Sequence, residues 1–364
     1  MNVVFTGGGT GGHLYPAIAI ADSLRARGAN ISFVGAADRM EATIVPKAGY
    51  SLVTVSSRPL SRRLNFDLFR TLFANTVGVA QAVSALRRLK PDIVIATGGY
   101  VCFPVVFAAK LLRVRAIALL EPNAHPGITN KILAPMVHEV WGAFELPDQR
   151  FVGKYVHTGI PVRSTLHALP SQEAAVERLG LSTKRRTILA MGGSQGARSI
   201  NDALTSIIKT DGLPNGWQLM HVTGEKEYDR VRLMLALDGM YDAPVVRPYL
   251  HDMADAYAAA DLVLARAGAS TLGELVATGK PALLIPYPHA SDDHQRVNAE
   301  EFARTGAAVV MDDREILAGK LRGVLAEVTA PSHLEPMKAA AQRLAASDPV
   351  ATILARVDAL LTLN

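Results

Sequence analysis

The sequence predicts an α/β protein with two doubly wound domains, and three observations support this fold class. A short apolar strand at residues 3–6 runs directly into the glycine loop 7–12 and then into a helix. The same succession of strand, glycine loop and helix begins again at Thr187. The chain has 364 residues, which is too long for one ordinary core. Two strand and helix series of similar size therefore imply two domains, with an interdomain cleft as the expected ligand site.

The first glycine loop has five glycines in six positions and is closed by His13. Glycines remove the Cβ atoms that keep an anion away from the backbone, and the start of the next helix directs N–H groups toward it. We therefore expect a phosphate site, with a tight turn that binds no ligand as the alternative. The loop matches G-x-G-x-x-G, but no acidic residue directly follows the next strand, 30–35, because Asp38 comes only later. A nicotinamide or flavin enzyme stays an outside alternative.

Composition narrows the class of protein. Hydrophobic residues make up 49% of the chain, but no apolar run approaches the roughly 18 to 20 residues of a membrane-spanning helix. The first strand begins at residue 2, so we expect no signal peptide and a cytoplasmic location. A net charge of +5 suggests an anionic partner, while the absence of zinc-finger spacing, RNP strands and long basic blocks argues against nucleic acid. The single cysteine, Cys102, is expected to be a small buried hydrophobe.

Residues 58–90 combine arginines with apolar side chains. Arg62 and Arg63 precede Phe66, Phe69 and Phe73. This pattern fits a surface that lies on a membrane, with rings in the interface and cations on lipid phosphates. A pair of core helices with solvated arginines fits the periodicity as well.

Two more buried-strand runs, 92–97 and 116–120, end in the turns 98–100 and 121–127. Ligands of open α/β sheets collect at the carboxyl ends of strands, so these turns and the first glycine loop are expected to face one crevice. Residues 159–163 are interpreted as a link. In the second half, further strands are expected at 187–191, 218–222, 245–247, 262–265, 282–285 and 307–311. Residues 335–363 are helical in composition and need not belong to the second domain.

The second half also carries candidate donor groups. Small residues at 268–270 open a helix that a diphosphate could approach, and the carboxylate of Glu274 could accept hydrogen bonds from both ribose hydroxyls. An exposed helix residue is the alternative for Glu274. His294 and Gln295 are donors suited to sugar hydroxyls, although both could equally be helix-capping polar groups.

Taken together, the motifs at 6–13, 97–100, 121–123, 192–197, 266–274, 294–295 and 298–299 resemble the MurG family over nearly the whole chain and in the same order. MurG enzymes are bacterial glycosyltransferases that add N-acetylglucosamine to lipid I and so make lipid II for peptidoglycan. The resemblance implies a GT-B fold with an acceptor and membrane-associating domain at 1–160. It also implies a UDP-N-acetylglucosamine domain at 161–340 and a C-terminal helix, 341–364, that packs back on the first domain.

By similarity, the site residues form four groups. His13 is the candidate catalytic residue. The donor would contact Thr10, Gly11, Gly12, Asn123, Arg163, Ser194, Arg266, Glu274, His294 and Gln295. The acceptor pyrophosphate would lie on Gly8, Gly9, Gly12, Gly98, Gly99 and Tyr100. The membrane patch would be Arg62, Arg63, Phe66, Phe69 and Phe73. The loop 287–293 departs from the family's glutamine-containing pattern, which makes the assignment of His294 weaker than that of Gln295.

The implied reaction is an inverting transfer that joins N-acetylglucosamine to the C4 hydroxyl of N-acetylmuramic acid through a β-1,4 linkage. His13 is the candidate base because its ordinary pKa is about 6.5, and a ligand of the acceptor phosphate is its competing role. The sequence has no Asp-x-Asp motif, so we expect no metal and no cofactor.

The expected partners are UDP-N-acetylglucosamine, lipid I and the anionic cytoplasmic face of the inner membrane, where the chain would be peripheral; nucleic acid is not among them. Other cell-wall synthesis proteins are open as partners. A GT-B epimerase, which needs no lipid acceptor, and a nucleotide-sugar sensor without turnover are the alternative functions.

Overall fold

The computed structural model describes residues 1–58, 66–146, 148–193, 196–235, 243–250 and 252–363. The chain divides into two compact units. Unit 1 contains Met1–Arg163 and Asp348–Asn364, and unit 2 contains Ser164–Ser347. Of the segment 341–364, expected to pack on the first domain, residues 341–347 belong to unit 2 and residues 348–364 to unit 1.

Unit 1 is built on a seven-stranded parallel sheet in the order β3-β2-β1-β4-β5-β6-β7. Its strands are β1 (Asn2–Thr6), β2 (Asn30–Gly35), β3 (Ser51–Thr54), β4 (Ile93–Ala96), β5 (Ala116–Glu121), β6 (Glu139–Gly142) and β7 (Tyr155–His157). A parallel sheet has both faces covered, so its central strands are nearly continuous apolar runs. This explains why β4 and β5 could be recognised in the sequence, whereas the short strands β3, β6 and β7 were not expected.

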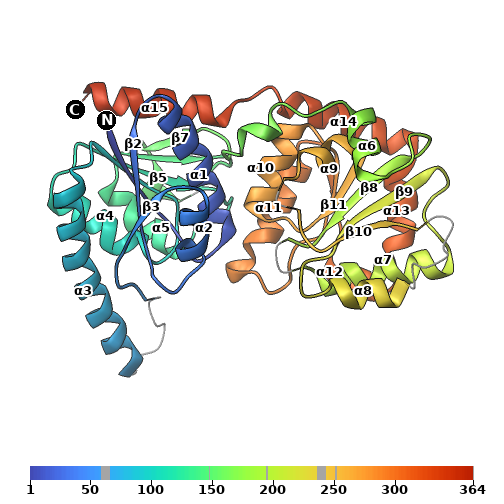
Figure 1. Cartoon of the computed structure of the whole chain (residues 1–364), viewed down its shortest axis with the longest axis horizontal. Helices are drawn as coiled ribbons and strands as arrows, with labels where there is room; N and C mark the ends of the chain where they lie inside the picture. The colour runs from blue at the N-terminus through green and yellow to red at the C-terminus, as the bar shows by residue number, and fades with distance from the viewer. Residues whose placement is uncertain (59–65, 147, 194–195, 236–242, 251, 364) are drawn as a thin grey trace. The chain divides into compact units, whose positions relative to one another are not determined.

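Helices cover both faces of this sheet (Figure 1). One face is packed by α1 (Gly11–Ala26), α2 (Glu41–Lys47) and α15 (Pro349–Leu363), and the other by α3 (Phe66–Leu89), α4 (Cys102–Leu111) and α5 (Ile128–Leu133). Two short 3-10 helices, Ala134–Met136 and Gln149–Phe151, complete the unit. Where the sequence suggested a membrane surface or two core helices at 58–90, the described part is one long helix whose first turns extend beyond the rest of unit 1 (Figure 1).

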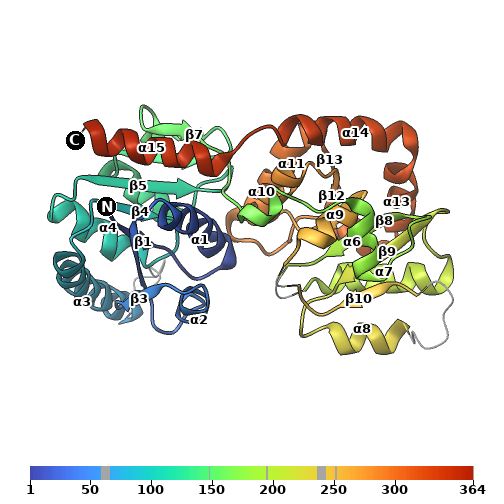
Figure 2. The ribbon, with the colours of Figure 1, turned by 45° about the horizontal axis from the view of Figure 1, so that its top comes forward.

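The last helix, α15, packs against α1 on unit 1 (Figure 2). Its apolar side chains Ile353, Leu354, Val357 and Leu360 are buried in the same core as Phe5. Arg356 forms an ion pair with Glu139, and the Glu139 carboxylate also accepts a hydrogen bond from the Trp141 indole at 2.8 Å.

Unit 2 repeats the plan with a six-stranded parallel sheet in the order β10-β9-β8-β11-β12-β13. The strands are β8 (Arg186–Met191), β9 (Trp217–Val222), β10 (Val245–Arg247), β11 (Leu262–Ala265), β12 (Ala282–Leu284) and β13 (Ala308–Val310). Its helices are η3 (Ser164–Leu166), α6 (Gln172–Leu179), α7 (Arg198–Thr210), α8 (Tyr228–Leu235), α9 (Ala254–Ala259), α10 (Ala269–Thr278), η4 (Ser291–Asp293), α11 (His294–Ala303), α12 (Asp313–Leu317), α13 (Leu321–Thr329) and α14 (Pro331–Leu344).

Each sheet reverses its strand order once, between β1 and β4 in unit 1 and between β8 and β11 in unit 2. Ligands of doubly wound sheets bind outside the carboxyl ends of the strands at such a reversal. The glycine loop after β1 and the one after β8 each stand at this point. The predicted fold class, two doubly wound parallel domains, is confirmed.

Candidate active site

The glycine loop of unit 1 holds His13 in the first turn of α1. The His13 Nδ1 lies 2.9 Å from the Gly8 carbonyl oxygen and 3.3 Å from the Thr10 hydroxyl. A carbonyl oxygen can only accept, so Nδ1 carries the hydrogen that makes the shorter contact. In the neutral ring, Nε2 then holds the lone pair. This tautomer is suited to a base that takes up a proton at Nε2.

The turn after β4 closes against the same loop. The Gly8 N–H donates to the Gly98 carbonyl at 3.1 Å, and the Thr97 N–H donates to the Thr6 carbonyl at 2.8 Å. Gly98 has a φ of +106°, and a Cβ there would lie 2.8 Å from His13 Nε2. Any larger side chain at Gly98 would therefore displace the imidazole. The first glycine loop and the 98–100 turn meet at one edge of the sheet, as the sequence predicted.

A buried carboxylate that was not expected from the sequence, Glu41, supports this loop. Glu41 is 1% exposed, and its two oxygens accept hydrogen bonds from Gly9 N–H at 3.0 Å and Ala36 N–H at 3.1 Å. A Cβ at Gly8 would lie 2.2 Å from a Glu41 oxygen. Gly8 is thus required by the protein's own packing, and one loop N–H is already bound to an acid.

The turn after β5 is organised by Glu121, which lies in the motif 121–123 but had no expected role. The Glu121 carboxylate is buried and accepts from the Asn123 backbone and side chain, the Gly127 N–H and the Asn130 amide, at 2.8–3.1 Å. Burial raises the pKa of Glu121, while these four donors lower it. The result is a rigid turn that presents Asn123 at the same edge as His13.

Four other predicted residues of unit 1 have described side chains. The Arg163 guanidinium lies 4.8 Å from the centre of the Tyr15 ring, and Tyr100 is 51% exposed. Cys102 is buried, and its thiol donates to the Gly98 carbonyl; burial raises the pKa of that thiol to about 12. In the expected membrane patch, Phe73 is 74% exposed on α3. Arg62 and Arg63 lie outside the described residues, and only the backbone of Phe66 and Phe69 is described.

In unit 2 the loop after β8 leads into α7, but Ser194 lies outside the described residues. The start of α7 is held by Arg266, which follows β11 and is 9% exposed. Its guanidinium donates to the Pro286 carbonyl at 2.9 Å and to the Ser199 hydroxyl at 2.9 Å, and it pairs with Asp313 at 2.7 Å. Arg266 therefore ties the ends of β11 and β12 to the first turns of α7 and α12.

Glu274 is half-buried in α10, and its carboxylate accepts a hydrogen bond from the Tyr257 hydroxyl at 2.6 Å. The same hydroxyl lies 4.0 Å from the sulfur of Met191, the last residue of β8. Glu274 is therefore close to the start of the second glycine loop. Tyr257, on α9, was not expected from the sequence because one tyrosine in an alanine-rich helix is indistinguishable from an ordinary core residue.

The loop before α11 is fixed by Gln295, whose side-chain oxygen accepts from the Tyr287 N–H at 3.0 Å. Asp292 and Asp293 precede His294 and both have left-handed backbones, with φ of 51° and 52°. Left-handed residues other than glycine are uncommon and concentrate at functional sites. His294 and Gln295 open α11 and are both partly exposed.

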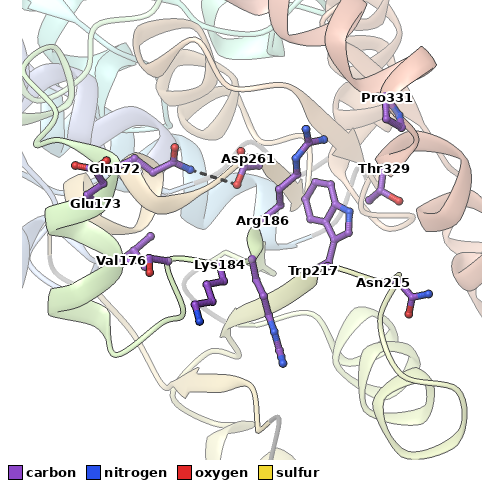
Figure 3. Close-up of a pocket in the computed structure, with 13 residues that line it drawn as sticks. Gln172, Glu173, Val176, Lys184, Arg186, Asn215, Trp217, Asp261, Thr329 and Pro331 are labelled. Atoms are coloured by element: carbon purple, nitrogen blue, oxygen red, sulfur yellow. Dashed lines mark hydrogen bonds between the residues drawn. The ribbon is translucent and has the colours of Figure 1, made fainter.

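A cavity of about 590 Å³ lies at the opposite, amino-terminal edge of the unit 2 sheet (Figure 3). Arg186 and Trp217, the first residues of β8 and β9, line it, with the guanidinium 6.0 Å from the indole ring. Gln172 donates to Asp261 across one wall at 3.2 Å. None of the predicted site residues lines this cavity.

No group of three or more His, Cys, Asp or Glu side chains in the described part is placed to hold a metal ion. No helix among the described residues is both long and apolar enough to cross a membrane.

Comparison with known proteins places the chain in a family. Residues 3–141 match the glycosyltransferase family 28 N-terminal domain, and residues 187–353 match the C-terminal domain of that family. Two similar proteins are both named UDP-N-acetylglucosamine–N-acetylmuramyl-(pentapeptide) pyrophosphoryl-undecaprenol N-acetylglucosamine transferase. The one from Moorella thermoacetica is 41% identical over 94% of this chain and 95% of its own, and the one from Halothermothrix orenii is 40% identical over 90% of each.

Solved structures agree with this placement. The crystal structure of Acinetobacter baumannii MurG is similar with a TM-score of 0.74 and 26% identity over 99% of both chains. The calicheamicin glycosyltransferase CalG4 is similar with a TM-score of 0.69 but only 16% identity, which shows a shared fold alone. The two matched domains, the relatives and the GT-B architecture together show that the chain is a glycosyltransferase that belongs to family 28 and, within it, to the MurG family.

Proposed function

We propose that this chain transfers N-acetylglucosamine from UDP-N-acetylglucosamine to lipid I and so forms lipid II. The observation that carries the proposal is the identity of about 40% to transferases of that name over at least 90% of both chains. Unit 2 is proposed as the donor domain and unit 1 as the acceptor domain. The polar groups at the two strand reversals support this division of roles.

For the donor, the carboxylate of Glu274 is proposed to accept from the ribose hydroxyls, because it lies close to the end of β8. The loop after β8 and the start of α7 would meet the diphosphate, with Arg266 beside it. His294 and Gln295 would contact the sugar. Thr10, Gly11, Gly12, Asn123 and Arg163 are proposed to contribute donor contacts from unit 1.

For the acceptor, Gly8, Gly9, Gly12 and the turn Gly98, Gly99 and Tyr100 are proposed to hold the pyrophosphate. His13 is proposed as the base. The C4 oxygen of the acceptor attacks the anomeric carbon of the donor, the bond from that carbon to UDP breaks, and the hydroxyl proton passes to His13 Nε2. The hydrogen bond from Nδ1 to Gly8 favours this role over that of a phosphate ligand, since a ligand role needs a hydrogen on Nε2 as well.

The growing charge on UDP would be met by helix N-termini, with no metal needed. Full loss of turnover on chelation, restored by one divalent ion, would contradict this. We further propose a peripheral contact with the anionic cytoplasmic face of the membrane through the start of α3, where Phe73 is exposed. Contact with other cell-wall synthesis proteins stays a prediction.

The experiment that tests the function measures UDP release from UDP-N-acetylglucosamine with and without a lipid I analogue, while the sugar is followed into product. Release and glycosylated lipid that both depend on the analogue would support the transferase. Release without an acceptor would instead favour an epimerase or a hydrolase. Binding of the nucleotide sugar without any turnover would favour a sensor.

A further inference from the structure

Tyr257 and Glu274 join two neighbouring helices of unit 2, α9 and α10. Tyr257 is fully buried, and its hydroxyl donates to Glu274 Oε2 at 2.6 Å. A hydrogen bond to a carboxylate is shorter and about twice as strong as one between neutral groups. The bond therefore anchors one carboxylate oxygen and restricts the orientations open to a half-buried side chain with three rotatable bonds.

The Tyr257 hydroxyl stays a donor at every working pH. Burial, and then the charge of Glu274, raise the pKa of Tyr257 well above its ordinary value. Tyr155 in β7 provides a contrast, because its buried hydroxyl has no hydrogen-bond partner among the described residues. A buried tyrosine hydroxyl in this protein therefore does not always donate to a carboxylate, although the charge of Glu145 also raises the pKa of Tyr155.

We propose that Tyr257 is a positioning residue that holds the Glu274 carboxylate in the orientation that grips both hydroxyls of the donor ribose. Tyr257 thereby sets the preference for a ribonucleotide over a 2′-deoxyribonucleotide. The inference rests on the proposed donor role of unit 2. Two hydroxyls on adjacent carbons require a carboxylate of defined plane, whereas a single hydroxyl is satisfied by a range of orientations.

The test is a comparison of UDP and 2′-deoxy-UDP binding to the full chain by titration calorimetry. Tyr257→Phe should weaken UDP about tenfold, which corresponds to about 1.4 kcal/mol, and should change 2′-deoxy-UDP by less than about twofold. The ratio of the two dissociation constants should fall accordingly. In steady-state assays, KM for UDP-N-acetylglucosamine should rise while kcat stays within about twofold.

Two controls separate positioning from general damage. Tyr155→Phe removes a buried tyrosine hydroxyl that has no hydrogen-bond partner in the described part of the chain, and it should leave both dissociation constants unchanged. In a Glu274→Ala background, Tyr257→Phe should have no further effect on the UDP to 2′-deoxy-UDP ratio, because Tyr257 acts only through that carboxylate.

An equal loss of affinity for both nucleotides in Tyr257→Phe, with a lower melting temperature, would mean a merely structural role and would overturn the inference. UDP binding with an unchanged ratio would overturn it too, but would leave the donor assignment intact. Failure of the wild-type chain to bind UDP at all would overturn the donor assignment and this inference together.

Discussion

The two units share one architecture but are held at their strand reversals by different buried groups, a single carboxylate in unit 1 and an ion pair in unit 2. In unit 1 the glycine loop rests on the carboxylate of Glu41, which accepts from two backbone N–H groups. In unit 2 the corresponding edge is held by the guanidinium of Arg266, which is balanced by Asp313. The doubly wound fold therefore provides a site for an anion, but it does not set the charges around that site. Those charges come from a few buried side chains that are far apart in the sequence.

The difference suits different tasks. In unit 1 the Glu41 carboxylate already accepts from the Gly9 N–H, so an acceptor phosphate at this loop would rely on the remaining donors there. An arginine and aspartate pair holds loops together without a large net charge. Changes that remove one of these groups should therefore harm one unit and spare the other.

The largest effect is expected at His13. His13→Ala should reduce transfer by about 10²- to 10⁴-fold, because the acceptor hydroxyl loses its base, while UDP-N-acetylglucosamine binding to unit 2 is spared. Single-turnover transfer and equilibrium binding measured on the same preparation would check this. His157→Ala, which removes an exposed histidine of the same unit, is the matched control. Equal damage to binding and transfer would show that His13 is not the base.

Arg266→Ala should destabilise unit 2 by about 3–5 kcal/mol, because the Asp313 carboxylate then stays buried without a cation and keeps only the hydrogen bond from Ser199. Hydrogen exchange followed by mass spectrometry would show faster exchange in α7 and α12 and little change in unit 1. The control is Arg304→Ala, which breaks an exposed ion pair with Glu301 and should cost well under about 1 kcal/mol. Unaltered exchange in α7 would contradict the bracing role of Arg266.

Mild acid should affect the stability of the two units differently, because burial shifts the pKa values of their titratable groups in opposite directions. Burial lowers the pKa of His221 in β9 to about 4. Unfolding below pH 6.5 therefore takes up a proton. The free energy of unfolding of unit 2 should fall by up to about 3 kcal/mol between pH 6.5 and pH 4. Burial raises the pKa of Glu121 in unit 1, so that its contribution is present below pH 4.5 and is lost as pH rises.

Denaturant melts at pH 7 and pH 4.5, followed by exchange in each unit, would measure this. His221→Gln should flatten the acid dependence of unit 2, and His333→Gln, which removes an exposed histidine of the same unit, should leave it unchanged. An acid response that persists in His221→Gln would assign it to other groups.

The smallest effect is expected at Glu41. Glu41→Gln keeps the size of the side chain but replaces one acceptor oxygen with an NH₂ group, so one of the two N–H groups at Gly9 and Ala36 is left unsatisfied. Unit 1 should lose about 1–3 kcal/mol and unit 2 none. Thermal unfolding would test it, with the exposed Glu145→Gln as control. A stability equal to that of the wild type would mean that the loop does not depend on the carboxylate.

Much of the fold could be predicted because its signals are local. Apolar runs next to glycine turns identified the central strands of both sheets, and residues 245–247 correspond to β10. The strands β3, β6 and β7 are only three or four residues long and carry polar or mixed side chains, so no local pattern separates them from loops. The expected boundary at residue 341 falls inside α14, because both helices are periodic and only packing assigns α14 to unit 2 and α15 to unit 1.

The candidate site was predictable in its glycine loops and in Glu274, because loops at strand ends are visible in sequence. The buried side chains that support these loops could not be predicted. Glu41 lies 32 residues beyond Gly9, and Asp313 lies 47 beyond Arg266, so their pairing exists only in the folded units. The one local signal that was available is the unusual glycine density, which reflects the packing of His13 and Glu41 as well as access for a ligand.

The return of α15 to unit 1 has a consequence for synthesis on the ribosome. All seven strands of the first sheet have been translated by residue 157, but the four apolar side chains of α15 that complete its core are added only after unit 2 has been made. Unit 2 is continuous in sequence and can fold as it emerges. The first unit to be translated is therefore the last to be finished, and until then chaperones would find an uncovered apolar face beside α1.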